Sequence, residues 1–597
     1  MAFARTRSVT LLGVDGVLVE VQADIEPGLA VFNLVGLPDK SVSESRDRVR
    51  AALVNSDEEW PPRRITVGLS PATVPKTGSG FDLAVACAIV AANGKLDPDR
   101  LTDLVMVGEV GLDGRVRPVR GILPAVMAAA AADCRRVVVP ESVAVEARLV
   151  PDVSVLGVRS LRHLLAVLRG QPVPDEPVLV TRPGPDPDTV GPMLVSGPGV
   201  PGVPAPDLAE VAGQARARRA LEVCAAGGHH LYLLGPPGAG KTMLAERLPG
   251  LLPPLGTAAA LEVSAVHSVA GTLPPDRPLV KEPPFCAPHH SATMPSLVGG
   301  GNGLPRPGAV SLAHHGVLFL DEAPEFSSRA LDALRQPLEG GTVTVARSAG
   351  TLRFPARFLL VLAANPCPCG RFAGKGLDCT CSAAMRSKYL ARLSGPLLDR
   401  IDVRVTVDPV SRAELLEPEG TGESTKVVAA RVREARDRAA HRFEGTPWTT
   451  NAEVPGRELR TRWSTEPDAL ATAARDLERG MLTARGLDRV LRVAWTIADL
   501  RGRDRPAMAD VDTALEFRTG VRRGAAAAVE PVGDAEHTGR TGRNGGSGGS
   551  GGLGGLGHAA RSGRITTDMA QATLAQLATM DVDRELHDPE FDFAGEA

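Results

Sequence analysis

The sequence predicts a multidomain α/β protein whose central unit is a parallel sheet built around a nucleotide-binding loop. Apolar strand patterns alternate with helical patterns over residues 207–412, an order typical of parallel α/β sheets. The stretch "LYLLGPPGAGKTML" places a glycine-rich loop between one such strand and the next helix. With 597 residues, the chain is long enough for several domains with separate cores.

Four further regions flank this unit. Residues 1–170 mix short apolar strands with small-residue helices, which predicts a separate α/β domain. Residues 171–206 are dense in proline and glycine and are interpreted as a semi-rigid linker. Residues 413–522 are charged, alanine-rich and helical, which predicts a helical lid. Residues 523–597 contain "NGGSGGSGGLGGLG", which is typical of a flexible tail.

The glycine-rich loop has the spacing of a P-loop that binds ATP. Its glycines let backbone N–H groups close around phosphate oxygens. Lys241 is expected to reach the β- and γ-phosphates, and the Thr242 hydroxyl to ligate Mg²⁺. A chance glycine-rich turn is the alternative. The predicted cofactor-binding residues of the loop are Gly235, Pro236, Pro237, Gly238, Ala239, Gly240, Lys241 and Thr242.

Polar residues end two later strand patterns. In "GVLFLDEAPEF", Asp321 is placed to hold Mg²⁺, and Glu322 is the natural general base for a water molecule. The alternative is a solvated strand edge. In "ARFLLVLAANP", Asn365 is expected to orient the attacking water, unless it only forms a turn before Pro366.

Two arginines are candidates for stabilising the transition state. Arg400, in "LSGPLLDRIDV", is expected to act across a subunit boundary. It pairs with Asp399 or Asp402 in the alternative reading. Arg485 opens a helix of the predicted lid, where it either reaches the γ-phosphate or is an ordinary exposed arginine.

Four cysteines form two C-x-C pairs in "CPCGRFAGKGLDCTC". Thiolates from Cys367, Cys369, Cys379 and Cys381 are enough to close a tetrahedral, structural zinc site. Their spacing is tighter than the usual C-x-x-C, so four unligated thiols are the alternative. Crowded cysteines in a reducing compartment indicate a metal sooner than disulfides.

The composition limits the classes of partner. A net charge of −3 provides no global positive field, so any contact with nucleic acid must come from local patches. Asp15 interrupts the N-terminal apolar run, and residues 122–132 are too short an apolar stretch to span a bilayer. We therefore expect a soluble, cytoplasmic protein with no membrane partner.

Two segments are candidates for loops that handle DNA. Residues 338–358 are read as strand, turn and strand, with Arg347 and Arg353 flanking the turn and able to hold phosphates. An ordinary surface hairpin is the alternative. Residues 281–308 form a long glycine-rich insertion. Its adjacent His289 and His290 suggest a metal site, but neighbouring side chains point apart on most backbones, so we expect a structural or pore-loop role instead.

The order of these motifs resembles that of the AAA+ ATPases. The stretches "VGLPDKSVSESRDRVRAA", "PDLAEVAGQ", "APHHS", "PRPGAVSLAHHGVLFLDE" and "NPCPCG" are similar to motifs of the magnesium-chelatase-like ComM/YifB family. The resemblance covers residue 1 to about 522. It implies a homohexameric ring that hydrolyses ATP, with a pore hairpin at residues 338–358. It also implies a DNA helicase that drives branch migration of recombination intermediates. A magnesium-chelatase-type motor and a regulatory scaffold without DNA are the alternatives.

The N-terminal region resembles the Lon protease proteolytic domain, an α/β fold like that of ribosomal protein S5. The matching stretches are "PKTGSGFDLAVA" and "GEVGLDGRVRPVRGILPAV". Lon-type proteases use a Ser–Lys dyad, whose positions are taken here by Gly80 and Leu123. We therefore expect no protease activity and interpret Ser79 as a turn residue in a scaffold domain.

Overall fold

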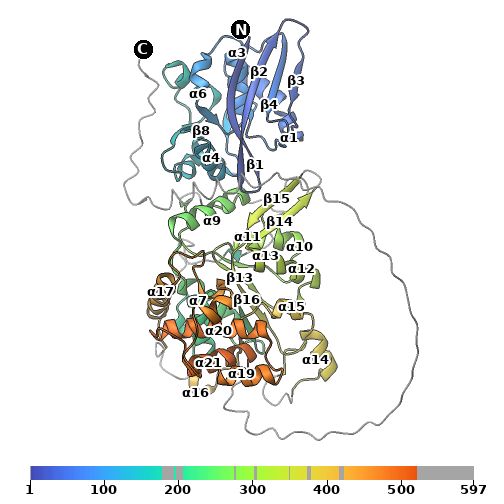
Figure 1. Cartoon of the computed structure of the whole chain (residues 1–597). Helices are drawn as coiled ribbons and strands as arrows, with labels where there is room; N and C mark the ends of the chain where they lie inside the picture. Colours follow the sequence, from blue (N-terminus) through green and yellow to red (C-terminus); the bar gives the residue numbers. More distant parts are fainter. Residues whose placement is uncertain are drawn as a thin grey trace, which may run out of the picture.

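The computed structural model describes residues 2–177, 194–195, 206–274, 277–301, 305–347, 350–372, 378–415 and 422–520. Two units are stacked, with the N-terminal α/β domain on one side and the nucleotide-binding core with its lid on the other (Figure 1). The predicted tail, residues 523–597, lies outside the described residues. None of the described helices is long and apolar enough to cross a membrane.

The N-terminal domain is built on a seven-stranded sheet in the order β3-β4-β2-β1-β5-β8-β9. Residues at alternate positions face opposite sides of a strand, and both sides of this sheet are covered. Leu104 and Met106 of β5 pack in the core that includes α3, whereas Val105 packs in the core that includes α4. The strands are β1 (Phe3–Leu12), β2 (Asp15–Glu26), β3 (Phe32–Val35), β4 (Arg64–Ser70), β5 (Leu104–Met106), β8 (Arg136–Pro140) and β9 (Ser154–Val158).

The helices of this domain follow from their sequence patterns. Every residue of α3 (Asp82–Ala92) is buried, as expected for a run of small and apolar residues. The amphipathic helix α6 (Leu161–Arg169) ends at Gly170, which adopts a left-handed conformation. The other helices are α1 (Lys40–Ser43), α2 (Ser45–Asn55), α4 (Ile122–Ala131) and α5 (Ala144–Ala147), and a small hairpin joins β6 (Glu109–Val110) to β7 (Val116–Arg117).

The predicted parallel sheet forms the second unit, with the strand order β10-β12-β13-β16-β11-β17. Its apolar strands are buried on both faces, as is typical of parallel sheets covered by helices. The strands are β11 (Leu231–Leu234), β12 (Phe285–Ala287), β13 (Val317–Leu320), β16 (Leu359–Ala364) and β17 (Val403–Thr406). The segment interpreted as a linker, residues 171–206, contributes one short element to this sheet. Residues Leu194–Val195 form β10, which pairs antiparallel with β12.

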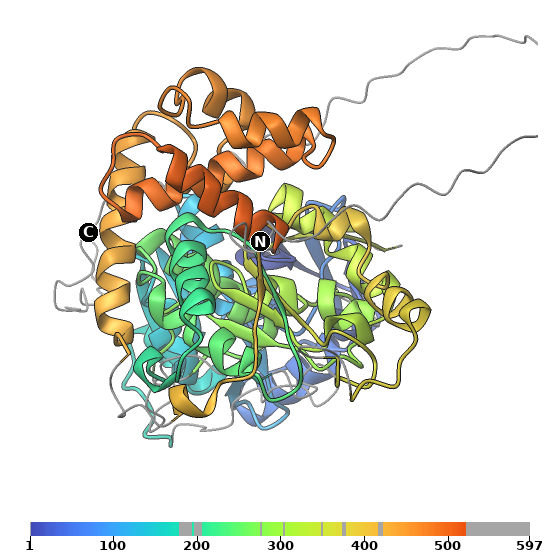
Figure 2. The same cartoon turned by 90° about the horizontal axis from the view of Figure 1, so that it is seen from below.

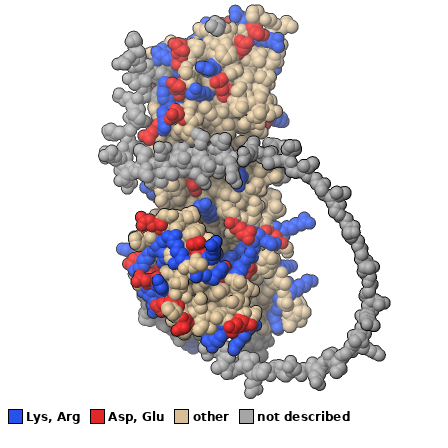
Figure 3. Space-filling model, in the orientation of Figure 1, with Lys and Arg blue, Asp and Glu red and all other residues tan. Residues whose placement is uncertain are grey.

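A helical lid lies along one side of the core (Figure 2). Its helices are α17 (Thr425–Arg442), α18 (Gly456–Thr461), α19 (Ala471–Glu478), α20 (Ala484–Leu500) and α21 (Met508–Thr519). Lys and Arg side chains gather over this region with Asp and Glu among them (Figure 3). Many of these arginines are committed to ion pairs, as Arg442 is to Asp499 (2.6 Å) and Arg431 to Glu222 (2.7 Å).

The N-terminal domain docks on the core through α9 (Thr257–Ala270) and the predicted hairpin. Leu261 of α9 is buried in the same cluster as α4, and Ser268 donates to Glu146 Oε1 (2.5 Å). The hairpin pairs β14 (Thr342–Arg347) with β15 (Gly350–Pro355). It contacts the turn between β1 and β2 so closely that a Cβ added at Gly13 would lie 2.7 Å from Arg353 O.

Candidate functional site

The candidate ATP site lies where β11, β13 and β16 end, because the carboxyl ends of parallel strands meet at one edge of a sheet. A Cβ added at Gly235 would lie 2.2 Å from Val407 O, so the loop needs glycine to leave β11. Gly238 and Gly240 have φ values of 75° and 90°, a left-handed conformation that favours glycine. The loop therefore curls back onto the start of α8 (Lys241–Arg247).

Lys241 is the centre of the site. Its Nζ donates to Gly235 O (2.7 Å), Pro236 O (2.9 Å) and Asn365 Oδ1 (3.1 Å). Burial lowers the pKa of Lys241, and the negative charges of Asp321 and Glu322 oppose that shift. The structure thus brings Asn365 beside the P-loop lysine, as its position at the end of β16 predicts.

The two predicted Mg²⁺ ligands are already in contact. Thr242 Oγ1 donates to Asp321 Oδ2 at 2.7 Å. A hydroxyl and a carboxylate are the oxygen ligands that Mg²⁺ prefers, with substrate phosphates completing the shell. A Cβ at Gly238 would meet nothing within 4 Å, so open space lies in front of the loop. These residues fit an ATP–Mg²⁺ site.

Glu322 has a constrained backbone. Its φ is 49°, which is uncommon for a residue with a side chain. Its N–H donates to Asp321 Oδ1 (2.9 Å), and its carbonyl accepts from the N–H of Glu325 (2.7 Å). Its carboxylate Oε2 lies 3.3 Å from Nδ1 of His290, a contact that the sequence did not predict.

Arg400 is held by its own chain away from these groups. Its Nη2 pairs with Glu339 Oε1, and its Nη1 donates to Pro396 O (2.5 Å). The side chain is only 12 % exposed. The alternative in which Arg400 pairs with Asp399 or Asp402 is wrong, because arginines of the lid occupy both acids. Glu339 lies on α13 (Arg335–Gly340), too far along the chain for spacing to reveal the pair.

Arg485 lies near Arg400 in the structure. Its side chain is 68 % exposed, and Nη1 is 3.5 Å from Asp399 Oδ2, one residue before Arg400. Among the described residues, its side chain makes no hydrogen bond or ion pair with the P-loop. Its predicted reach to a γ-phosphate stays a prediction.

The lid forms hydrogen bonds and an ion pair with the segment that carries Arg400. Arg489 of α20 pairs with Asp402 Oδ1 (2.5 Å) and donates to Arg400 O (3.0 Å). His229 Nδ1 lies 3.2 Å from Asp402 Oδ2. Although burial favours the neutral acid, the charge of Arg489 and the His229 contact hold the pKa of Asp402 far below its usual range. The position of Arg400 therefore depends on the lid.

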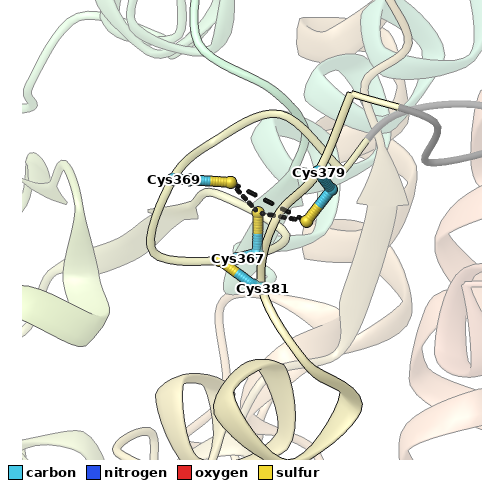
Figure 4. A group of neighbouring side chains, drawn as sticks. All are labelled: Cys367, Cys369, Cys379 and Cys381. Carbon is cyan, nitrogen blue, oxygen red and sulfur yellow. Dashed lines mark hydrogen bonds between the residues drawn. The ribbon is translucent and has the colours of Figure 1, made fainter.

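The four cysteines converge on one point (Figure 4). Sγ of Cys367 lies 3.3 Å from that of Cys369, and Cys379 lies 3.7 Å from both. All four sulfurs, including that of Cys381, lie within 4.8 Å of one another. Zn–S bonds of about 2.3 Å in a tetrahedron place sulfurs about 3.8 Å apart, so the cluster fits a structural zinc ion.

This cysteine cluster touches the P-loop. A Cβ added at Gly370, between the two C-x-C pairs, would lie 2.6 Å from Pro237 Cγ. Burial raises the pKa of Cys367 to about 11, whereas the N–H of Arg371 lowers that of the exposed Cys369 to about 6. The turn after Asn365 thus links the cluster to the ATP site.

The predicted DNA-contacting arginines lie on the β14–β15 hairpin at the junction of the two units. Arg353 is exposed, and its charge acts on Asp15 of the N-terminal domain. The pKa of Asp15 is raised, because loss of solvent around the carboxylate outweighs the opposing effect of the Arg353 charge. Arg347 ends β14, but its side chain lies outside the described residues. Contact of either residue with DNA stays a prediction.

At the positions of the Lon-type dyad, the domain has packing residues. Leu123 is fully buried in the core around α4. A Cβ at Gly80 would touch Val107 Cγ1 at 3.5 Å. Ser79 Oγ donates to Glu109 Oε2, which fixes the turn before α3.

Glu262, His314 and His315 form a cluster that the sequence does not predict, because Glu262 lies on α9 and the histidines lie about fifty residues later, before β13. Glu262 Oε2 lies 3.1 Å from His314 Nε2 and 3.3 Å from His315 Nε2. His314 Nδ1 accepts from the N–H of Arg357 (3.1 Å), so its proton resides on Nε2 and points at Glu262. That tautomer cannot bind a metal through Nε2. The cluster instead ties α9 to the start of β13.

Comparisons with known proteins agree along most of the chain. Family models described as "Magnesium chelatase, subunit ChlI", "Subunit ChlI of Mg-chelatase" and "Magnesium chelatase, subunit ChlI C-terminal" match residues 207–415, 21–143 and 422–518. Competence protein ComM of Haemophilus influenzae is 39 % identical over 523 residues, which are 87 % of this chain and 98 % of that protein. The chain belongs to the ComM/YifB family of magnesium-chelatase-like AAA+ ATPases.

Other relatives of this ComM/YifB-family ATPase support the same domain order. Protein YifB of Escherichia coli is 38 % identical over 87 % of the chain and 97 % of its own length. An uncharacterized protein of Mycobacterium tuberculosis is 50 % identical over 88 % of the chain and its whole length. Lon protease 1 of Thermus thermophilus is 30 % identical over 145 residues, which are 23 % of the chain and 18 % of that protease. The predicted Lon-like and AAA+ fold is confirmed.

Proposed function

We propose that this AAA+ ATPase works as a homohexameric ring in which each ATP site is completed by Arg400 of the neighbouring copy, and that it remodels DNA. One observation supports the shared site most directly. Within the described residues, the hydrogen bonds and ion pairs of the Arg400 side chain lead to Glu339 and Pro396 and none to the P-loop, Asp321 or Asn365. An arginine acting in trans accelerates phosphoryl transfer by about 10³–10⁵.

Each residue of the site has a separate task. The loop N–H groups and Lys241 bind the phosphates, for which Lys241 exchanges its carbonyl partners for phosphate oxygens. Thr242 and Asp321 would hold Mg²⁺, which when bound neutralises charge on the phosphates. Glu322 accepts the proton of the attacking water, and Asn365 orients that water. Arg400 leaves Glu339 and stabilises the charge on the γ-phosphoryl group of its neighbour's ATP.

A mixing experiment tests the shared site. Lys241→Ala and Arg400→Ala should each hydrolyse little ATP alone. In mixed rings, the Arg400→Ala copy supplies an intact P-loop and the Lys241→Ala copy supplies an intact arginine. About a quarter of the interfaces in a random 1:1 mixture are then complete, so activity should reappear on mixing. Failure of the mixture to regain activity, or full-speed hydrolysis by a monomer in sedimentation experiments, would refute the shared site.

The DNA-remodelling part of the proposal rests on the relatives and on the hairpin. The name of the Haemophilus relative places that protein in competence. Arg353 lies exposed on the β14–β15 hairpin, where an exposed guanidinium is suited to a phosphate contact. We expect branched DNA to stimulate ATP hydrolysis and the protein to drive branch migration, with Lys241→Ala as the inactive control. In Arg347→Ala/Arg353→Ala, DNA should lose its stimulating effect.

A second candidate is a magnesium-chelatase-type motor without DNA, favoured because all three matching family models are named for a magnesium chelatase subunit. ATPase activity that ignores linear and branched DNA at every salt concentration would support this candidate or a regulatory scaffold.

We further propose that Cys367, Cys369, Cys379 and Cys381 hold one structural zinc ion. Four sulfur ligands leave no open position for catalysis. Elemental analysis should find one zinc per chain, and Cys379→Ser/Cys381→Ser should lose it. A full zinc content in that variant would exclude this site.

A further inference from the structure

We propose that His290 is a positioning residue for ATP hydrolysis, and that it acts by fixing the carboxylate of Glu322. The inference rests on the proposed role of Glu322 as general base. It gives a function to the second histidine of "APHHS", for which the sequence predicts only a structural or pore-loop role.

The sheet topology brings the two residues together. β12 and β13 are neighbouring parallel strands, with Phe285 opposite Val317. Their carboxyl ends therefore lie at the same edge, beside the P-loop. His290 follows the end of β12 by three residues, and Glu322 follows the end of β13 by two. His290 Nδ1 lies 3.3 Å from Glu322 Oε2.

The turn that carries His290 is closed by a hydrogen bond and followed by a capped helix. The N–H of Ala292 donates to His289 O (2.8 Å), which closes the turn. Thr293 then caps α10 (Met294–Val298) by accepting from the N–H of Ser296. The imidazole is therefore presented from a short, hydrogen-bonded turn rather than from a free loop.

The backbone of Glu322 is equally constrained, by its left-handed φ and by its bonds to Asp321 and Glu325. What remains free is rotation of its side chain, which is about half exposed. Among the residues that the structure describes, His290 is the side chain whose polar atom lies against this carboxylate. The contact between the imidazole nitrogen and Oε2 restricts this rotation and points the other oxygen in one direction.

A general base works only when its oxygen lies within hydrogen-bond reach of the proton that it takes. A misplacement of about 1 Å costs up to about 100-fold in rate. Loss of His290 should therefore reduce turnover without changing the groups that hold ATP, since the described hydrogen bonds of Lys241 and Thr242 go to other residues.

The test compares His290→Ala with His289→Ala in the full-length protein. His289 is the neighbouring control: its ring lies against that of His290, with centroids 4.0 Å apart, but its Nδ1 bonds to Ser291 Oγ (2.8 Å) instead of to Glu322. We expect His290→Ala to lower kcat by about 10- to 100-fold with an unchanged Kd for a fluorescent ATP analogue. His290→Asn, which keeps a donor, should regain part of kcat, and His289→Ala should stay within about twofold of the wild type.

A double-mutant cycle separates this inference from the proposed function. If His290 acts through Glu322, His290→Ala should add little to the loss caused by Glu322→Gln. Wild-type kcat in His290→Ala, no gain from His290→Asn, or an equal loss in His289→Ala would overturn the inference while leaving Glu322 as the base. Wild-type kcat in Glu322→Gln would instead overturn the proposed role of Glu322.

Discussion

The ion pair between Arg489 and Asp402 offers the sharpest test of how the lid supports the segment that carries Arg400. Asp402 is 2 % exposed, and Arg489 is 14 % exposed. The substitution Arg489→Met removes the charge but keeps an unbranched apolar stem in place of the arginine stem. Asp402 then stays buried, and of its contacts with Arg489 and His229 the one with His229 remains.

The expected cost follows from this burial. Removing one partner of a buried pair destabilises a protein by about 3–5 kcal/mol, because the remaining charge is not compensated. A loss of 1 kcal/mol lowers Tm by about 2–4 °C in domains of 150–250 residues, so we expect a decrease of at least about 5 °C. Differential scanning calorimetry measures this shift. Because Arg489 also donates to Arg400 O, kcat should fall as well.

A double variant provides the control. Replacing a buried pair with apolar residues is often neutral, so Arg489→Met/Asp402→Leu should be more stable than Arg489→Met alone. A Tm within about 2 °C of the wild type for the single variant, or a double variant less stable than the single one, would refute the reasoning.

Three further predictions follow from the same structure. The pKa of Asp402 is lower in the folded protein than in the unfolded chain, where it is about 4. The ion pair with Arg489 therefore stabilises the fold above about pH 4, and this contribution is lost as the pH falls below that value. The Tm difference between wild type and Arg489→Met should shrink between about pH 4 and pH 3. Gly370 has a φ of 74°, and a Cβ there would lie 2.6 Å from Pro237 Cγ, so Gly370→Ala should weaken the binding of a fluorescent ATP analogue about tenfold. Gly395→Ala is the control, because its Cβ would meet nothing within 4 Å, and it should bind the analogue normally. Leu261→Ala, at a buried position of α9 against the N-terminal domain, should cost about 2–5 kcal/mol and lower Tm in calorimetry; an unchanged Tm would show that the two units do not stabilise each other.

Local patterns predicted most of the elements. The strand before the P-loop, the strand that ends at Asp321 and the helix α17 follow from apolar periodicity, which depends only on neighbours in the chain. The grouping of Lys241, Thr242, Asp321 and Asn365 was also predictable, because carboxyl ends of parallel strands share one edge. The two-residue strand β10 was missed, since its pairing with β12 has no signal in a segment rich in proline and glycine.

What the sequence determined by itself is the chemistry: a phosphate-binding loop, two acids, a strand-end amide and four clustered thiols, each encoded by residues close together in the chain. Tertiary structure alone decided which charged side chains pair with each other and which elements pack together. It paired Arg400 with Glu339, Asp402 with Arg489 and Glu322 with His290, and it set the β14–β15 hairpin against the turn near Gly13. Charged side chains are long and choose partners by proximity in the folded state, so their pairing depends on how whole elements pack and cannot be found from spacing along the chain.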